Sequence, residues 1–279
     1  MTTVPTSPAG GTQKEQRLEL KLRTSPGSYF IERARDLVLA PEYFYSRLPD
    51  NTYTGTSTAH KNRLCETTYA SVLSAFELTW KTMFGLIVDL TPMYDKRLLN
   101  EKSTKDSVQL ESLLAHRGEN SIGHILAASL GVWQQPRMVN ERFKALMEIE
   151  PLSSAHASEL VELWQIRHVV AHNAGVITPL DAHRLNDMNL TGKSLRIDFD
   201  FLSKTERQLG TILRSGCQQV HKRALCGAKE QRDDGKMNDE EVAPLLLAAS
   251  IVNRSDPPTL IPLPEVASQL ESHHCDRCS

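Results

Sequence analysis

The amino-acid sequence predicts an all-α protein, and two observations support this fold class. Apolar residues recur at steps of three and four positions over several long stretches, which is the spacing of one buried helix face. Prolines and glycines stand at the ends of the longest of these stretches. The chain has 279 residues, enough to bury one sizeable core. We therefore expect a helical bundle with flexible N- and C-terminal tails.

The N-terminal part divides into two predicted regions. Residues 1–27 are poor in apolar side chains and contain several prolines and glycines, so we expect a disordered lead-in. Residues 28–59 are predicted to form a helical N-terminal extension. Its apolar pattern runs from Ser28 to Ala40, and the helix is expected to end before Pro41, because a residue that precedes proline disfavours the helical conformation.

The strongest helical pattern begins near Cys65 and ends before Pro92. Its apolar positions follow three- and four-residue steps without a break, which predicts a long core helix. Glu77 lies on the flank of this stripe, either as a solvated boundary residue or as a residue that faces a polar site. The apolar positions are Tyr69, Val72, Leu73, Phe76, Trp80, Met83, Phe84 and Ile87.

Shorter helices are predicted next, and a long helix closes the domain. The long helix covers about residues 202–224 and follows an extended piece at residues 194–201. Together, residues 60–225 are predicted to form the helical domain, and residues 226–279 a linker and a loosely ordered tail. The shorter helices are expected at residues 108–115, 122–133 and 139–147, and a further one after the capping residues Ser153 and Ser154.

Charge and cysteine content limit the classes of function. The net charge of -2 gives no overall basic field that would attract nucleic acid or an anionic membrane, so any contact with RNA must come from a local cluster. Five cysteines in a chain of this length form no disulfide framework, and their odd number fits a reducing compartment. The sequence shows no signal peptide and no apolar run of about 18 residues, so we expect a cytoplasmic protein that does not cross a membrane.

The most informative stretch is a mostly apolar helix that carries Arg167, His168 and His172. Burying an arginine or a histidine without a partner is costly, so we expect these side chains to be paired or to face a cleft. Asn173 and Gly175 follow at once and predict the end of the helix. An arginine and a histidine five positions apart are not a specific pattern, and the apolar helix and its stop give the pattern its weight.

This stretch resembles the HEPN superfamily, whose members share a helical bundle. One helix of the family carries an arginine, a polar residue, three variable positions and a histidine, which match Arg167, His168, residues 169–171 and His172. The string RHVVAHNAGVI is similar to the arginine–histidine–asparagine–glycine form that HEPN proteins of bacterial defence and toxin systems carry. The first long helix of the family often contains a hydrophobic–Glu pair, and SAFELTW around Glu77 is similar.

The resemblance implies a metal-independent endoribonuclease that needs no cofactor. Arg167 and His172 would be its catalytic residues, with His168, Asn173 and Glu77 in supporting roles. Histidine side chains titrate near pH ~6.5 and can act as acid or base, and arginine offers a fork of donors that matches phosphate oxygens. Attack by a 2′-hydroxyl on the adjacent phosphate would restrict the reaction to RNA.

Helix geometry adds an expectation about assembly. Five positions rotate by roughly 500° on an α-helix, which leaves Arg167 and His172 about 140° apart, on different faces. In the HEPN family two protomers bring these helices together, so the resemblance implies a homodimer with a composite site for RNA. It also implies a toxin or antiviral defence role with a cognate antitoxin or defence partner. The resemblance covers about residues 65–225.

Other interpretations of these residues stay open. Arg167 can form a buried ion pair with Glu77 or Glu162, and His172 can cap the carbonyl groups at the helix end. The chain would then be a non-catalytic HEPN-like dimerisation and interaction module. Accessibility separates the two functions. In an enzyme His172 opens onto a cleft, whereas in the interaction module partners cover both Arg167 and His172.

No metal site is expected. His168 and His172 share one helix face, but the glutamate that follows the first histidine in zinc proteases is absent, and no third ligand is indicated. The C-terminal tail resembles half a zinc site that is too compact to complete a tetrahedron alone, so we expect it to be incidental. Its residues are His273, His274, Cys275 and Cys278.

Overall fold

The structure is a computed structural model that describes residues 25–47, 56–100 and 121–251. The predicted all-α class is confirmed over this part of the chain, which is mostly helical and contains no strand beyond one isolated bridge between Val176 and Ser194. The predicted helix at residues 108–115 and the C-terminal cysteine and histidine residues lie outside the described ranges.

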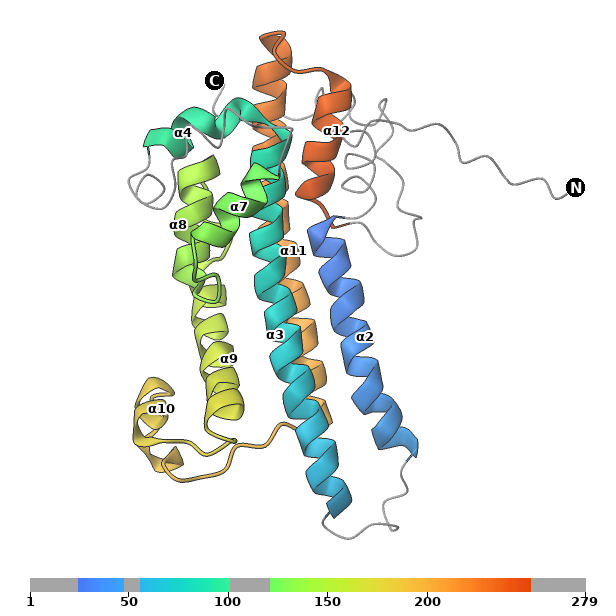
Figure 1. The fold of residues 1–279 in the computed structure, drawn as a ribbon, viewed down its shortest axis with the longest axis vertical. Coiled ribbons are helices and arrows are strands. Elements are labelled where there is room, and N and C mark those ends of the chain that lie inside the picture. The colour runs from blue at the N-terminus through green and yellow to red at the C-terminus, as the bar shows by residue number, and fades with distance from the viewer. Residues whose placement is uncertain (1–24, 48–55, 101–120, 252–279) are drawn as a thin grey trace, which may run out of the picture.

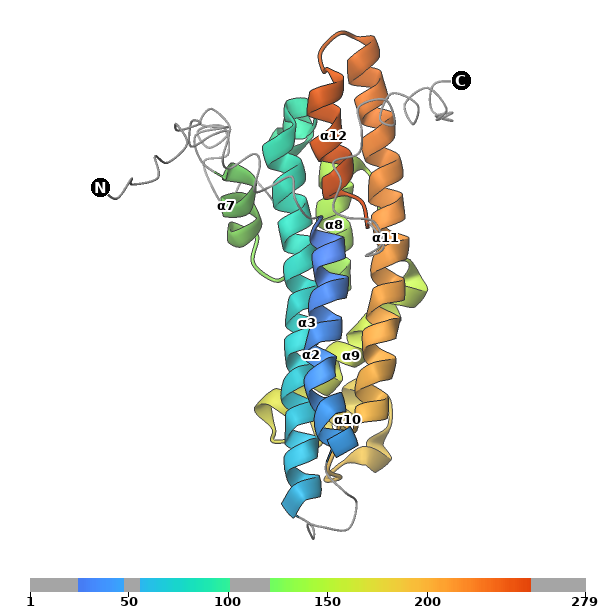
Figure 2. The ribbon, with the colours of Figure 1, turned by 90° about the vertical axis from the view of Figure 1, so that its right-hand side faces the viewer.

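Three long helices run side by side along the molecule, and shorter ones cover their flanks (Figures 1 and 2). The long helices are α2 (Pro26–Arg47), α3 (Thr56–Leu90) and α11 (Phe199–Asp233). The shorter helices that pack on them are α7 (Ile122–Ser129), α8 (Pro136–Met147), α9 (Ser154–His172) and α12 (Asp239–Ala248). The remaining elements are η1 (Pro92–Tyr94), α4 (Asp95–Asn100), α10 (Pro179–Arg184) and η2 (Met188–Leu190).

The predicted apolar stripe of α3 is the centre of the core. Every one of its eight predicted positions is buried. Aromatic rings from α2, α3 and α8 meet there edge to face, and such pairs each contribute about 0.5–1.5 kcal/mol beyond the burial of their surface. The ring centroids lie 5.5 Å apart for Phe30–Phe76, 6.1 Å for Phe76–Trp80, 5.6 Å for Trp80–Phe143 and 6.0 Å for Phe84–Phe143.

Helix α7 crosses α3 at a pair of glycines. A Cβ atom on Gly123 would collide with the carbonyl oxygen of Gly85, so the two backbones meet where no side chain fits. Asp89 of α3 secures the start of α7. One carboxylate oxygen accepts a hydrogen bond from the Gly123 backbone N–H at 2.8 Å, and the other lies 3.2 Å from His124 Nδ1.

Two predicted helix ends are wrong, and packing explains both. Helix α2 continues through Pro41 to Arg47; the Pro41 side chain is buried, and that packing compensates for the lost backbone hydrogen bond. Helix α11 continues beyond Ala224 to Asp233, because Cys226, Gly227 and Ala228 are buried against neighbouring helices.

The ends of the bundle also differ in detail from the prediction. The limit predicted between residues 225 and 226 falls inside α11, and only residues 234–238 separate that helix from α12. Helix α12 contributes Val242, Leu245 and Leu246 to the same core as α2 and α3. The predicted extended piece is shorter than expected, because the carboxylate of Asp198 caps α11 by accepting from the Phe201 N–H at 2.8 Å.

The segment His60–Leu90 of α3 has the length and composition of a membrane span. However, 61% of its most apolar window is buried against other helices. The central helix of a globular bundle has this property, because it is apolar on most of its faces.

We predict that Gly123→Ala destabilises the fold by about 1–3 kcal/mol, because the new methyl group collides with the Gly85 backbone. Helix propensity alone would favour alanine by about 1 kcal/mol, so a net loss of stability identifies the helix contact. Urea denaturation measures the change. Ala128→Ser, at an exposed position of the same helix, should stay within about 0.5 kcal/mol of the natural chain; a stable Gly123→Ala variant would contradict the close crossing.

Candidate functional site

Helix α9 presents the predicted motif residues. It begins at Ser153, whose hydroxyl accepts a hydrogen bond from the His156 N–H at 3.2 Å. Its buried face packs into the core through Leu160, Leu163 and Ile166, whereas Val169 packs in a small separate cluster with Ile177 and Ala182. The hydroxyl of Tyr69 on α3 donates to the Leu163 carbonyl oxygen at 2.8 Å, which fixes α9 against the central helix.

The end of α9 forms where the sequence predicts it. The N–H groups of Asn173 and Gly175 both donate to the Val169 carbonyl oxygen at 3.1 Å, and Ala174 and Gly175 have φ angles of 50° and 81°. This left-handed turn is a common helix stop. A Cβ atom at Gly175 would lie 2.8 Å from the Leu195 carbonyl oxygen, so glycine is also required for the close approach of the two chain segments.

Three backbone hydrogen bonds then join this turn to the segment that leads into α11. We call these bonds the clasp. Leu195 donates to the Gly175 carbonyl oxygen at 2.7 Å and Ile177 to that of Lys193 at 3.0 Å, while Gly192 donates to that of Ile177 at 2.8 Å. The end of α9 and the start of α11 are therefore held together.

A buried carboxylate, Asp181 of α10, organises the same corner. It is 1% exposed and accepts hydrogen bonds from the side-chain amides of Gln165 and Asn173, both at 2.7 Å. It also accepts from the Thr178 hydroxyl at 2.6 Å and the Thr178 N–H at 3.1 Å. The side-chain amide of Asn173, the predicted supporting residue, is thus tied to α10 through Asp181.

The pKa of Asp181 lies below the usual value for aspartate. Burial by itself would raise the pKa, but the hydrogen bonds from Thr178, the nearby charge of His168 and the hydrogen bond from Asn173 together outweigh it. Asp181 is therefore a buried anion at neutral pH, beside the C-terminal turn of the motif helix.

Arg167 packs between α9 and α3. Its NH2 atom donates to the Ser74 hydroxyl at 3.2 Å, and its guanidinium carbon lies 5.1 Å from the centre of the Trp164 ring. Its Nε atom is buried and has no hydrogen-bond partner. Among the described residues, no carboxylate lies within ion-pair distance of this guanidinium, so neither of the predicted acidic partners, Glu77 or Glu162, pairs with it.

Glu77 nevertheless lies in the electrostatic neighbourhood of Arg167. Burial raises the pKa of Glu77, and the positive charges of Arg167, Lys81 and Arg142 oppose that rise. The residue is half-buried on α3, one helical turn after Ser74. Glu77 is therefore a nearby acid, and Ser74 is the residue that holds the arginine.

His168 and His172 lie together on an exposed face of α9. Their ring centroids are 4.9 Å apart, with the ring planes inclined by 43°. No hydrogen bond or ring contact in the described part of the chain joins Arg167 to His172. The structure thus brings the two histidines together and leaves the arginine on another side of the helix.

A groove of about 1270 Å³ lies beside this face, between α8, α9 and α10. His168 is part of its wall, and the cationic side chains of Arg137, Lys144 and Arg184 also line it. Acidic side chains are interspersed among them. These belong to Glu141, Glu150 and Glu162. The groove is open and of mixed charge.

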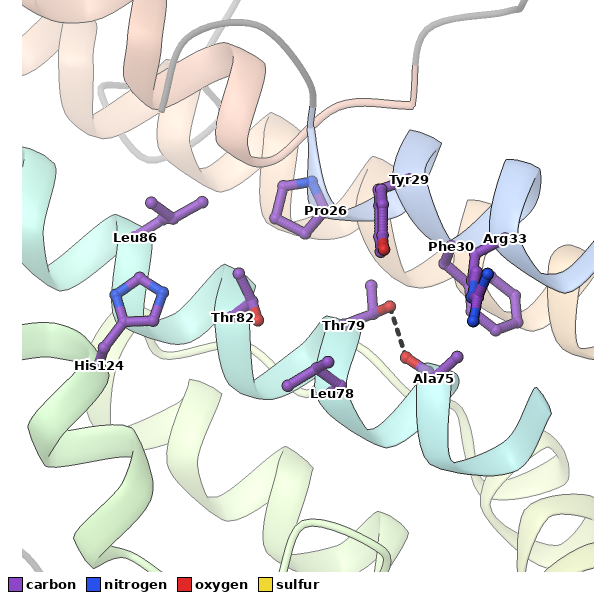
Figure 3. A pocket seen from close by; sticks show the side chains of 10 residues that line it. All are labelled: Pro26, Tyr29, Phe30, Arg33, Ala75, Leu78, Thr79, Thr82, Leu86 and His124. Atoms are coloured by element: carbon purple, nitrogen blue, oxygen red, sulfur yellow. Dashed lines mark hydrogen bonds between the residues drawn. The ribbon is translucent and has the colours of Figure 1, made fainter. Parts of the chain in front are cut away.

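A second, more apolar cavity of about 550 Å³ lies between α2, α3 and α7 (Figure 3). Leu78, Leu86 and Phe30 are among the apolar side chains that line it, and Arg33 and His124 lie at its two ends. The imidazole of His124 is already engaged by Asp89 at 3.2 Å. The cavity therefore offers apolar burial without a catalytic pair.

Sequence reasoning missed the residues that fix the site. Asp181 holds Asn173 and is itself bound by Gln165. Ser74 and Trp164 make the contacts that hold Arg167. One local pattern could have revealed the first of these. Thr178 and Asp181 form a reciprocal capping box at the start of α10, and that three-residue spacing is visible in the sequence.

Within the described ranges, no group of three or more histidine, cysteine, aspartate or glutamate side chains could hold a metal ion. No protein-family model matches the sequence, and neither the curated proteins nor the solved structures give a match.

We predict that Asp181→Asn lowers stability at neutral pH by about 1.5–3 kcal/mol, because the charged acceptor of four hydrogen bonds is lost. A carboxylate whose folded pKa is depressed stabilises the fold above its unfolded pKa of about 3.9, and this contribution is lost as the pH falls through the lower folded pKa. The difference between the natural chain and the variant should therefore shrink below about pH 4. Urea denaturation at pH 7 and pH 3 measures it.

The exposed carboxylate of Asp36, in the middle of α2, gives the matched control, since Asp36→Asn should have little effect at either pH. A stability difference for Asp181→Asn that is equally large at both pH values would show that the charge of Asp181 does not contribute.

Proposed function

We propose that this protein is a metal-independent endoribonuclease of the HEPN type that acts as a homodimer on RNA through Arg167 and His172. The observation that carries the proposal is the set of contacts that Arg167 makes. This cation stands in an apolar helix without an ion-pair partner among the described residues, held by a hydroxyl and an aromatic ring. A guanidinium that no carboxylate neutralises keeps its full positive charge available for a phosphate.

The residues suit the chemistry of RNA cleavage. The 2′-hydroxyl oxygen attacks the adjacent phosphorus, the bond to the 5′-oxygen breaks, and a 2′,3′-cyclic phosphate and a free 5′-hydroxyl are formed. His172 is exposed and can take the proton of the attacking hydroxyl or supply one to the leaving oxygen. Arg167 would stabilise the negative charge on the phosphate oxygens through paired N–H donors.

A second protomer would complete the site. Arg167 contacts α3, whereas His172 lies with His168 on the exposed face. Two motif helices related by a two-fold axis would place the arginine of one protomer near the histidine of the other. A toxin or antiviral defence role, with an antitoxin or defence partner, is the biological setting that we infer from the sequence resemblance alone.

One observation favours the second candidate, a non-catalytic dimerisation module. The Nε atom of Arg167 is buried, and its NH2 atom is bound to Ser74, so part of the guanidinium is already occupied within the protomer. Val176 and Leu180, which follow the motif helix, are exposed apolar residues at 47% and 57% and would suit a contact between copies.

We predict that the purified protein cleaves RNA in the presence of EDTA and leaves cyclic phosphate ends. His172→Ala should reduce the rate about 10²–10⁴-fold, because a general acid or base is removed. Total RNA is the substrate, and mass spectrometry of the fragments identifies the ends. His183→Ala, at another exposed histidine, is the control and should cleave at the natural rate.

Loss of cleavage on addition of EDTA would overturn the metal-independent mechanism. Light scattering of the same samples tests the assembly, and a fully active monomer would overturn the composite site.

We predict that Arg167→Lys stays folded and loses most of the activity, because lysine keeps the charge but not the planar pair of donors. Thermal unfolding and RNA cleavage are measured on the same preparations. Ser74→Ala is the matched variant, since it removes the hydroxyl that binds Arg167 and leaves the arginine in place.

The two candidate functions give different outcomes. Near-native melting with lost cleavage supports the enzyme. A melting temperature that falls sharply for both Arg167→Lys and Ser74→Ala, together with no cleavage by the natural chain, would favour the interaction module.

A further inference from the structure

The exposed histidine pair on α9 has the geometry of a metal chelate. His168 and His172 are four positions apart, so both side chains project from one face of the last two helical turns. Their ring centroids lie 4.9 Å apart, and both residues are exposed to solvent. The helix itself therefore brings the two imidazoles close together.

The separation of the rings agrees with what a tetrahedral ion requires. A zinc–nitrogen bond of about 2.0–2.1 Å, extended to the middle of an imidazole, places each ring centre roughly 3.2 Å from the metal. At a tetrahedral angle, two such centres are then about 5 Å apart. The observed 4.9 Å matches this value.

The electrostatic surroundings also favour a cation. The pair lies at the C-terminal end of α9, where the unpaired carbonyl groups carry partial negative charge. The buried anion Asp181 is close enough for its charge to interact with His168. A divalent ion at this position would thus be attracted by the helix end and by the nearby negative charge of Asp181.

We propose that His168 and His172 bind a divalent transition metal, and that metal binding blocks the catalytic action of His172. Zn²⁺ is the ion that we test, because the ring separation of 4.9 Å matches its tetrahedral geometry. Water completes the coordination, because the described residues supply no third ligand within a metal-binding group. Because only two protein ligands hold the ion, metal binding is reversible, in contrast to a structural zinc site with four protein ligands.

The inhibitory consequence rests on the proposed ribonuclease function, whereas the metal binding does not. A metal ion occupies the nitrogen lone pair of His172, and a coordinated imidazole can neither accept nor donate the proton that RNA cleavage requires. Zn²⁺ would therefore inhibit the reaction, and a chelator would restore it.

Isothermal titration calorimetry with ZnCl₂ and the metal-free full-length chain, without an affinity tag and without RNA, tests the binding. The C-terminal residues His273, His274, Cys275 and Cys278 are competing zinc ligands in the sequence. The titrations therefore use a background in which the two histidines are replaced by alanine and the two cysteines by serine.

We expect one Zn²⁺ per chain in this background. His168→Ala and His172→Ala should each weaken binding by about 10–100-fold or more, because even the loss of an outer-shell partner typically costs that much and each histidine is a direct ligand. His183→Ala retains the affinity, because this exposed histidine of α10 has no ring contact with the pair. Thermal unfolding without Zn²⁺ shows that each variant is folded. The rise in melting temperature on addition of Zn²⁺ should follow the same order as the affinities from calorimetry.

An affinity for Zn²⁺ that is the same in His168→Ala, in His172→Ala and in their parent chain would overturn the proposal. So would a parent chain, with only the tail residues replaced, that binds no Zn²⁺. In that case the contact at 4.9 Å is ordinary ring stacking. Inhibition is measured separately, as the ratio of the cleavage rates with Zn²⁺ and with EDTA for each variant. A chain that binds Zn²⁺ through the pair but never cleaves RNA would refute the ribonuclease and leave the metal site standing.

Discussion

The burial of one continuous face of α3 is the constraint on which the rest of the bundle depends. Helices α2, α7, α9, α11 and α12 all pack against this helix. Its aromatic side chains interlock edge to face, so the neighbouring helices have little freedom to slide. The polar border of the same helix supplies Ser74, which meets Arg167, and Asp89, which caps α7. The core and the polar contacts of the site thus come from two sides of one helix.

The sequence predicts the features that follow from local periodicity, such as helices and some of their ends. It does not predict the side-chain contacts that depend on how two helices are placed along each other. The apolar stripe of α3 and the stop at Asn173 and Gly175 follow from local patterns, and both are found in the structure. The partner of Arg167 depends on how far α9 slides along α3. A shift of less than one helical turn would place Glu77 beside Arg167 in place of Ser74. No local sequence pattern determines the position of α9 along α3.

The same distinction explains the helix ends. Proline predicts a boundary from local conformation, yet the buried Pro41 lies inside α2, because tertiary packing compensates for the missing hydrogen bond. The contacts of Asp181 are partly local and partly tertiary. Its capping box with Thr178 is a local pattern, but its bonds to Gln165 and Asn173 need the chain to fold back on α9.

The clasp between the end of α9 and the start of α11 has a consequence for dynamics. Its three donors, Leu195, Ile177 and Gly192, lie in segments without regular helix, where amide hydrogens usually exchange quickly with solvent. Because these bonds join two helices that both enter the core, they open only when the helix ends separate. Slow exchange at these loop amides would therefore report that the histidine-bearing end of α9 and the first turn of α11 unfold as a single cooperative unit.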